Sequence, residues 1–181
     1  MSAPNPLHRK TIALIGLMGV GKSTIGKRLA AALGLPFRDA DAEIETAAGR
    51  SIVEIFEQFG EDAFRDGERR VIARLLAEPP HVLATGGGAF ADPQTRALIR
   101  EHAVSVWLKA DLEVLARRIG RRDTRPLVAG KDPLEVLTRQ AAARHEAFAT
   151  ADIIIESAET AHQVTVDAVL RALGERVAAA P

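Results

Sequence analysis

The sequence predicts an α/β domain in which a five-stranded parallel sheet is covered by helices on both faces. Five short apolar runs alternate along the chain with segments of helical periodicity, the order that produces parallel strands with helical connections. The first run, residues 11–15, is continuous, as in a strand buried on both faces. The length of 181 residues suits one domain. We expect that domain over 11–175, a loose tail over 1–10 and a frayed end over 176–181.

Turn-forming residues separate the other elements. A glycine-rich turn follows the first strand and opens a helix over 22–33, which Gly34 closes. The remaining strands are expected over 36–38, 81–84, 103–108 and 152–155. The remaining helices are expected over 42–77, after Pro93, over 111–119, over 133–150 and at the C-terminal end.

The helical region 42–77 is expected to be interrupted twice, near Gly49 and near Gly60. Ser51 followed three residues later by Glu54 fits a capping box where the helix restarts. Spacings of three and four then predict one apolar helix face made of Ile52, Ile55, Phe56 and Phe59.

Composition and charge exclude several classes of function. Lys plus Arg and Asp plus Glu both number 24, so no net charge attracts the chain to nucleic acid or membrane. The absence of cysteine excludes disulfides, thiolate catalysis and a Cys-built zinc site. Basic residues 8–10 and the apolar run 11–20 have the outline of a signal peptide, but a membrane span needs about 20 residues. We expect a cytoplasmic protein that binds neither nucleic acid nor membrane.

The turn after the first strand carries the most specific motif. Gly16-Leu-Met-Gly-Val-Gly21-Lys22-Ser23 matches the P-loop pattern G-x-x-x-x-G-K-[ST], between an expected strand and an expected helix. Its glycines let the backbone turn tightly and approach phosphate oxygens, and its N–H groups form an anion site with the helix N-terminus. The alternative is a glycine-rich turn with an incidental lysine. We expect ATP to be bound by Gly19, Val20, Gly21, Lys22, Ser23 and Thr24.

A P-loop occurs in kinases, switch GTPases and motor ATPases. The Asn-Lys-x-Asp stretch of guanine recognition and the Leu-Ser-Gly-Gly-Gln signature of transporter ATPases are both absent from the sequence. At this size the sequence therefore favours a small-molecule or nucleotide kinase.

Two carboxylates follow the second expected strand. Asp39 and Asp41 would lie at the carboxyl end of the sheet, where open α/β folds bind ligands. If the segment is extended, their spacing of two points both side chains to the same side. Asp39 would then lie nearer Mg²⁺ and phosphate, and Asp41 nearer an acceptor hydroxyl. The alternative is that Asp39 merely caps the following helix.

Arg65 lies inside the helical region and has two interpretations. Its guanidinium can bind a carboxylate through two parallel hydrogen bonds, or it can pair on the surface with Glu61 or Glu68 at helical spacings. Both remain open. Gly67 lowers helix stability by about 1 kcal/mol relative to alanine, so we expect its small size to be needed there.

Two further segments indicate ligand contact. Three glycines, 86–88, follow the third strand, which favours backbone lying directly against a ligand over an ordinary turn. Five arginines crowd residues 117–125, ahead of Pro126-Leu127. In a protein with a P-loop, an arginine-rich loop over about 120–132 predicts a lid that closes over ATP. The alternatives are that these arginines form a solvated surface or a nucleic-acid-binding patch.

In combination these motifs resemble those of the shikimate kinase family. The matching segments are residues 16–24, Asp39-x-Asp41, Phe64-Arg65-x-x-Glu68, Gly86-Gly87-Gly88, Arg125-Pro126-Leu127, and Arg144 before Phe148. The resemblance covers residues 10–173. It implies a nucleoside-monophosphate-kinase-like P-loop fold with an arginine-rich lid. It also implies a monomer that phosphorylates the shikimate 3-hydroxyl with ATP and Mg²⁺, in the route to chorismate and aromatic amino acids.

On the acceptor side, the resemblance implies that Asp41 binds the ring hydroxyls and orients or deprotonates the attacked one. Arg65 and Arg144 would hold the substrate carboxylate, and Gly87 and Gly88 would supply backbone contacts. The helical region 41–78 would thus form the substrate-binding part of the domain.

On the nucleotide side, the resemblance implies that Lys22 and Arg125 act in catalysis by neutralising charge on the transferred phosphate. Arg118 would stack on adenine. Ser23 would ligate Mg²⁺ directly, and Asp39 would contact it through water.

One departure from the family pattern is Phe148, where a tyrosine is common; the chain contains no tyrosine. A ring that only packs tolerates this change, whereas a hydroxyl contact would be lost.

Two alternatives to a shikimate kinase remain. One is a kinase for gluconate or a nucleoside monophosphate, and the other is a nucleotide-binding switch module with little turnover.

Overall fold

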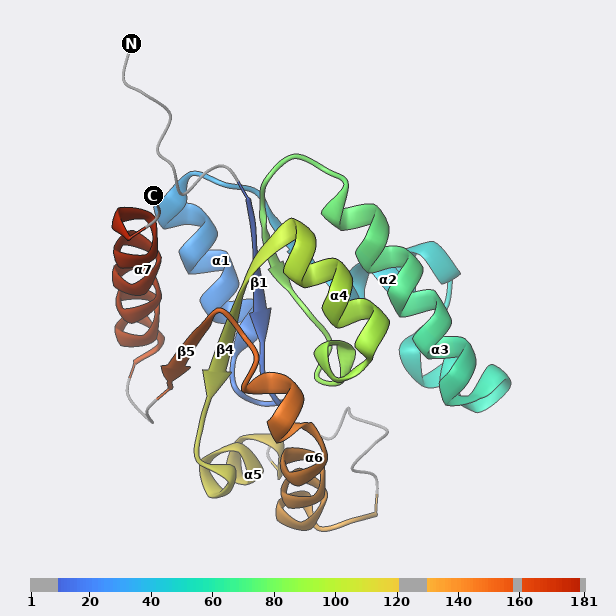
Figure 1. The fold of residues 1–181 in the computed structure, drawn as a ribbon. Helices are drawn as coiled ribbons and strands as arrows, with labels where there is room; N and C mark the ends of the chain where they lie inside the picture. Colours follow the sequence, from blue (N-terminus) through green and yellow to red (C-terminus); the bar gives the residue numbers. More distant parts are fainter. Residues whose placement is uncertain (1–9, 121–129, 158–160, 180–181) are drawn as a thin grey trace.

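The computed structural model describes residues 10–120, 130–157 and 161–179. Five parallel strands form one sheet in the order β2-β3-β1-β4-β5 (Figure 1). This confirms the predicted α/β class and number of strands. The strands are β1 (Thr11–Ile15), β2 (Phe37–Asp39), β3 (Val82–Ala84), β4 (Ala103–Lys109) and β5 (Ile153–Glu156).

Helices cover both faces of this sheet. They are α1 (Lys22–Leu33), α2 (Ala40–Ala48), α3 (Ile52–Leu76), α4 (Pro93–His102), α5 (Leu112–Gly120), α6 (Pro133–Phe148) and α7 (His162–Ala178), with a short 3₁₀ turn η2 (Ala89–Ala91). Figure 1 shows α1 and α7 on one side of the sheet, α4 on the other, and α5 and α6 beyond the carboxyl ends of the strands.

The central strand explains why the first apolar run is continuous. All five residues of β1 are buried, since β1 pairs with β3 on one side and β4 on the other while helices cover both faces. In register, Leu14 lies opposite Ala84 and Ile15 opposite Trp107. The adjacent carboxyl ends of β1, β2 and β3 therefore open at one edge of the sheet, where the loops after these strands meet.

The region between β2 and β3 contains both predicted interruptions. Gly49 ends α2 with a positive φ of 62°, and α3 bends at Gly60, where φ is 80° and ψ is 176°. The capping box is confirmed. The backbone N–H of Ser51 donates to Glu54 Oε2 at 2.7 Å, and the backbone N–H of Glu54 donates to Ser51 Oγ at 3.2 Å.

Two local expectations were wrong. Phe59 does not share the buried face of Ile55, because it directly precedes the bend and is 57% exposed, with the Arg50 guanidinium 5.2 Å from its ring centroid. A Cβ built on Gly67 has no described atom within 4 Å, so close packing does not explain this glycine. The frayed end expected over 176–181 stays a prediction; the structure describes α7 as helical to Ala178.

Some expectations lie outside the described residues. They are the tail before residue 10, the lid segment 121–129 and residues 180–181. Within the described ranges, no helix is both long enough and apolar enough to cross a membrane.

Candidate active site

The P-loop connects β1 to α1 and has the geometry of an anion cradle. Gly19 and Gly21 have φ values of 84° and 96°, a left-handed conformation that side chains other than glycine rarely adopt. Gly21 is the N-cap of α1, so the free N–H groups of the first helical turn point from the helix toward the cradle that the loop forms. The Lys22 ammonium lies over the loop and donates to the carbonyls of Gly16 at 2.7 Å and Leu17 at 3.1 Å.

Asp39 caps the following helix, which the sequence left as an alternative, and it also lines the cavity over the P-loop. Its Oδ1 caps α2 by accepting the N–H groups of Asp41 at 3.1 Å and Ala42 at 3.4 Å. Its Oδ2 accepts the Ser23 hydroxyl at 2.6 Å. One carboxylate thus connects the start of α1 with the start of α2.

Asp41 shares a cavity with Asp39, as expected, but for a different reason. The segment is not extended: α2 begins at Ala40, and Asp41 lies in its first turn. Because Asp39 caps the helix, α2 starts directly at the carboxyl end of β2 and holds both carboxylates there.

Two adjoining cavities occupy this edge of the sheet. The first, about 430 Å³, lies over the P-loop and is also lined by Asp39, Asp41 and Arg118. The second, about 280 Å³, lies between α2, α3 and α6. Its polar lining comes from Asp41, Glu45, Arg65, Glu68 and Arg144, and its apolar lining from Ile52, Val53, Phe56 and Phe64. Met18, Asp41 and Gly87 line both cavities, so Asp41 lies where they join.

Arg65 lines the second cavity and is also ion-paired. Its Nη1 lies 2.7 Å from Glu68 Oε2 and its Nη2 lies 3.3 Å from Glu61 Oε1. Burial of the Arg65 guanidinium lowers its pKa, but the charges of Glu68 and Glu61 outweigh this, and the pKa lies above its usual value. Both interpretations from the sequence are therefore compatible: the glutamates orient a guanidinium that borders the cavity.

Glu68 is a second buried charge of this cavity, and its importance was missed. It is 1% exposed, and its Oε1 has no hydrogen-bond partner among the described residues. Burial raises the pKa of the Glu68 carboxyl, Arg65 opposes this, and the nearby charge of Asp41 adds to it. Its spacing of three from Arg65 was visible in the sequence, but that spacing is equally common on exposed helix surfaces.

Arg144 enters the same cavity from α6. Its Nη1 donates to the Gly87 carbonyl at 2.8 Å and to Gln140 Oε1 at 3.3 Å. Burial lowers the pKa of Arg144, and so does the like charge of Arg65. Two partly buried guanidiniums on one cavity can both donate hydrogen bonds to a carboxylate, whose charge would offset the repulsion between them.

The three glycines after β3 lie between these groups. A Cβ on Gly86 would be 2.6 Å from Glu68 Oε1, and one on Gly88 would be 2.6 Å from Arg65 Nη2. A Cβ on Gly87 would meet nothing described closer than 3.5 Å, although Gly87 lines both cavities. Gly86 and Gly88 are therefore small for the protein's own packing, whereas Gly87 leaves space that a ligand can use.

The remaining predicted nucleotide residues divide into three groups. Thr24 and Arg118 line the first cavity, and Arg118 Nη1 also donates to the Gly19 carbonyl at 3.3 Å. The Val20 side chain is completely buried beneath the loop. Arg125 lies outside the described residues.

Sequence reasoning missed several lining residues. Met18 occupies a variable position of the P-loop motif, Ile119 lies on α5, and His162 begins α7; all three line the first cavity. A variable motif position, a helical isoleucine and a lone histidine carry no functional signal by themselves.

Phe148 packs in the core and does not border the second cavity. It is buried, with its ring centroid 5.7 Å from that of Trp107 and 6.4 Å from that of Phe90. A tyrosine hydroxyl is therefore not needed for the packing of this ring.

Comparison with known proteins shows which family the chain resembles over most of its length. The family model for shikimate kinase matches residues 18–174. The shikimate kinase of Caulobacter vibrioides is 68% identical over 168 residues, covering 93% of this chain and 84% of that protein. The shikimate kinase of Zymomonas mobilis is 49% identical over 173 residues, covering 96% and 98%.

A solved structure gives the same result. The shikimate kinase of Acinetobacter baumannii in complex with shikimate superposes with a TM-score of 0.89 at 33% identity, covering 92% of this chain and 94% of that one. Fold, site motifs and relatives agree over nearly the whole described chain: it belongs to the shikimate kinase family, a family of ATP-dependent kinases with a P-loop fold.

Proposed function

We propose that this protein transfers the γ-phosphoryl group of ATP to the 3-hydroxyl of shikimate, giving shikimate 3-phosphate and ADP. The observation that carries the proposal is the pair of adjoining cavities, one over a P-loop and one bordered by Arg65 and Arg144, with Asp41 lining both. A donor phosphate and an acceptor hydroxyl can meet at this junction.

The second cavity suits a small hydroxylated ring that bears a carboxylate. The guanidiniums of Arg65 and Arg144 would bind the carboxylate, and the backbone at Gly87 and Gly88 would contact the ring. Apolar side chains of α3 line the same cavity and would contact the carbon edge of the ring. The buried charge of Glu68 keeps Arg65 oriented before substrate arrives.

In the proposed reaction the 3-hydroxyl oxygen bonds to the γ-phosphorus while the bond from that phosphorus to the β,γ-bridging oxygen breaks. Asp41 accepts a hydrogen bond from the hydroxyl, aligns it and takes its proton as the new bond forms. Lys22 and Arg125 neutralise charge that develops on the transferred group and on ADP. Arg118 stacks on the base.

The residues present fit a magnesium ion. Ser23 Oγ, at the start of α1, and Asp39 Oδ2, at the end of β2, lie 2.6 Å apart, so a hydroxyl oxygen and a carboxylate oxygen are both available to a cation. Mg²⁺ retains several waters and binds through few protein oxygens plus phosphates, as such a site requires. Ser23 would hold it directly and Asp39 through water, and the ion would supply positive charge next to the phosphates.

The proposal extends to organisation. Residues of about 41–78 would act as the substrate-binding region and residues of about 120–132 as a lid that excludes water during transfer. We propose a monomer that acts in the cytoplasm, as implied by the resemblance to the family. Light scattering at micromolar concentration tests the monomer, because a dimer would double the molar mass.

The test of function is an ADP-release assay with MgATP and shikimate, gluconate or AMP as acceptor. Turnover with shikimate alone supports the proposal. Turnover only with gluconate or AMP would retain the phosphate cradle and contradict the roles of Asp41, Arg65 and Arg144. Failure to phosphorylate any of the three would instead favour a nucleotide-binding switch.

A further inference from the structure

The glycine loop, residues 86–92, follows β3 and leads through η2 to the N-cap of α4. Four of its carbonyl groups accept backbone N–H groups three or four positions further along the chain: Gly86 from Ala89, Gly88 from Ala91, Ala89 from Asp92, and Asp92 from Arg96. Side chains donate to the other three carbonyls, those of Gly87, Phe90 and Ala91. The conformation of the loop therefore depends on these side-chain donors as well as on its own backbone.

Arg96, one turn into α4, supplies two of the three side-chain contacts. Its Nη1 donates to the Phe90 carbonyl at 3.0 Å and to the Ala91 carbonyl at 3.1 Å. Arg96 is half-buried, and Phe90 is completely buried. Removing the guanidinium would leave two carbonyls of a largely buried turn without their donor, which costs more than the loss of an exposed hydrogen bond. Arg96 thus holds the end of the glycine loop that lies away from β3.

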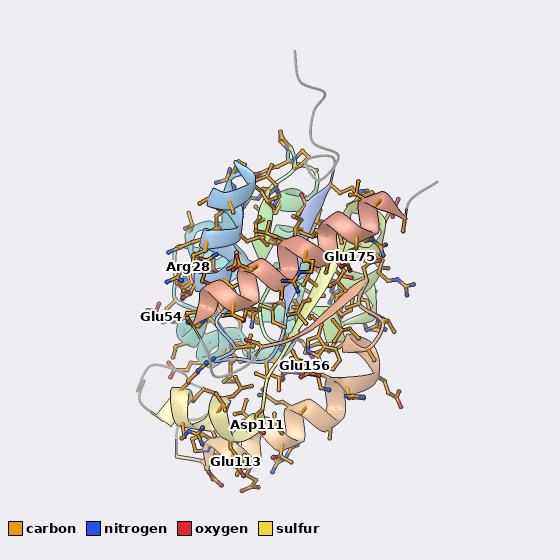
Figure 2. The ribbon with its side chains drawn as sticks, turned by 90° about the vertical axis from the view of Figure 1, so that its left-hand side faces the viewer. Arg28, Glu54, Asp111, Glu113, Glu156 and Glu175 are labelled. Carbon is orange, nitrogen blue, oxygen red and sulfur yellow. The ribbon has the colours of Figure 1, made fainter. Side chains whose placement is uncertain are left out.

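Arg144 supplies the third contact and also reaches the loop indirectly. Its Nη1 donates to the Gly87 carbonyl at 2.8 Å. The Phe90 ring centroid lies 6.4 Å from that of Phe148, the last residue of α6, which is the helix that carries Arg144. Helix α6 packs on η2 and also on α5, which Figure 2 shows beside it with Glu113 in its first turn. The loop is therefore in contact with α6 both at its glycines and at η2.

We propose that Arg96 is a positioning residue for acceptor binding. By holding the end of the glycine loop, it fixes the Gly87 carbonyl where Arg144 donates to it, and so fixes the Arg144 guanidinium at the second cavity. Arg96 is not among the described residues that line either cavity, so it acts through Gly87 and Arg144. This inference rests on the proposed function, because it requires a carboxylate-bearing acceptor in the second cavity.

The physical reason is preorganisation of a buried cation. Burial and the like charge of Arg65 both lower the pKa of Arg144, so its guanidinium depends on oxygen acceptors such as the Gly87 carbonyl. If the end of the loop is released, Gly87 can take several positions, and substrate binding must then order both the loop and the guanidinium. The ordering cost weakens acceptor binding. The P-loop contacts with nucleotide are held by β1 and α1 and should not change.

The experiment compares Arg96→Ala and Arg96→Gln with the wild type in the ADP-release assay, varying shikimate and ATP separately. Glutamine keeps much of the side-chain volume, but its amide is shorter and carries no charge. Arg96→Lys keeps a long cationic donor and tests for rescue. Arg100→Ala is the matched control, because Arg100 lies one turn further along α4 and is exposed. Urea unfolding measures the stability of each variant separately.

For Arg96→Ala and Arg96→Gln we expect the KM for shikimate to rise about threefold to tenfold, with kcat and the KM for ATP within about twofold of the wild type. Arg96→Lys should recover part of the loss, and Arg100→Ala should behave as the wild type does. An arginine with a merely structural role would lower stability without this selective change in one KM.

A double-mutant cycle tests whether Arg96 acts through Arg144. Arg96→Ala should lower kcat/KM for shikimate by a smaller factor in the Arg144→Ala background than in the wild type. Equal factors in both backgrounds, or an unchanged KM for shikimate, overturn the inference. If Arg96→Ala does not fold, Arg96→Gln replaces it in both comparisons. A wild type that does not phosphorylate shikimate would overturn the proposed function, and this inference with it.

Discussion

The substitution Gly87→Ala tests whether the protein needs a glycine at this position to bind its ligand or to fold. Gly87 lines both cavities, and its φ lies outside the left-handed region, so alanine can adopt its backbone conformation. The new Cβ would lie 3.5 Å from the Met18 nitrogen and 3.7 Å from Arg144 Nη1, which are ordinary contact distances. The methyl group therefore fits the free protein and projects into the space proposed for substrate.

The expected magnitudes differ for folding and for binding. Alanine restricts the unfolded chain, so the free energy of unfolding should be unchanged or rise by up to about 1 kcal/mol. An added methyl group at a filled site typically costs about 1–3 kcal/mol. Because about 1.4 kcal/mol corresponds to a factor of ten, the KM for shikimate should rise roughly tenfold or more.

The assay pairs denaturant unfolding of the free protein with initial rates over a range of shikimate concentrations. Gly88→Ala is the comparison, because its Cβ would lie 2.6 Å from Arg65 Nη2 and must displace an ion-paired guanidinium. That variant should lose roughly 1–3 kcal/mol of stability as well as substrate affinity. The reasoning is refuted if Gly87→Ala binds shikimate as the wild type does, or if it loses as much stability as Gly88→Ala.

Three further outcomes are expected. Gly67→Ala should raise the free energy of unfolding by roughly 0.5–1 kcal/mol in urea titrations and leave both KM values unchanged, because its Cβ meets no described atom within 4 Å; a loss of stability would contradict this. Glu68→Gln should become more stable relative to the wild type as the pH rises above 4.5, the pKa of an unperturbed glutamate, because burial makes the ionised form of Glu68 unfavourable in the folded state. Free energies of unfolding measured from pH 4.5 to 8 would contradict this if the variant instead became less stable relative to the wild type. In the same ADP-release assay, Arg65→Ala should mainly raise the KM for shikimate, and Arg125→Ala should mainly lower kcat. If Arg125→Ala weakened shikimate binding and left kcat unchanged, the role of Arg125 on the transferred phosphate would be excluded.

Periodicity and motif spacing predicted much of this protein from local sequence. The continuous apolar run of β1, the capping box at Ser51 and the glycine interruptions of the helical region each depend on residues close together in the chain. The P-loop is equally local, since β1, the turn and α1 are consecutive. These features were predictable because the interactions that form them are made within a few residues.

Only tertiary structure determined which side chains face the same cavity. Arg65 could pair on a helix surface or line a cavity, and the answer depends on α6, which brings Arg144 to the other side. The exposure of Phe59 follows from the bend at Gly60, and the place of His162 follows from the packing of α7 beside α1. Sequence spacing specifies neighbours along one element, whereas burial, charge compensation and cavity walls arise where elements distant in the chain come together.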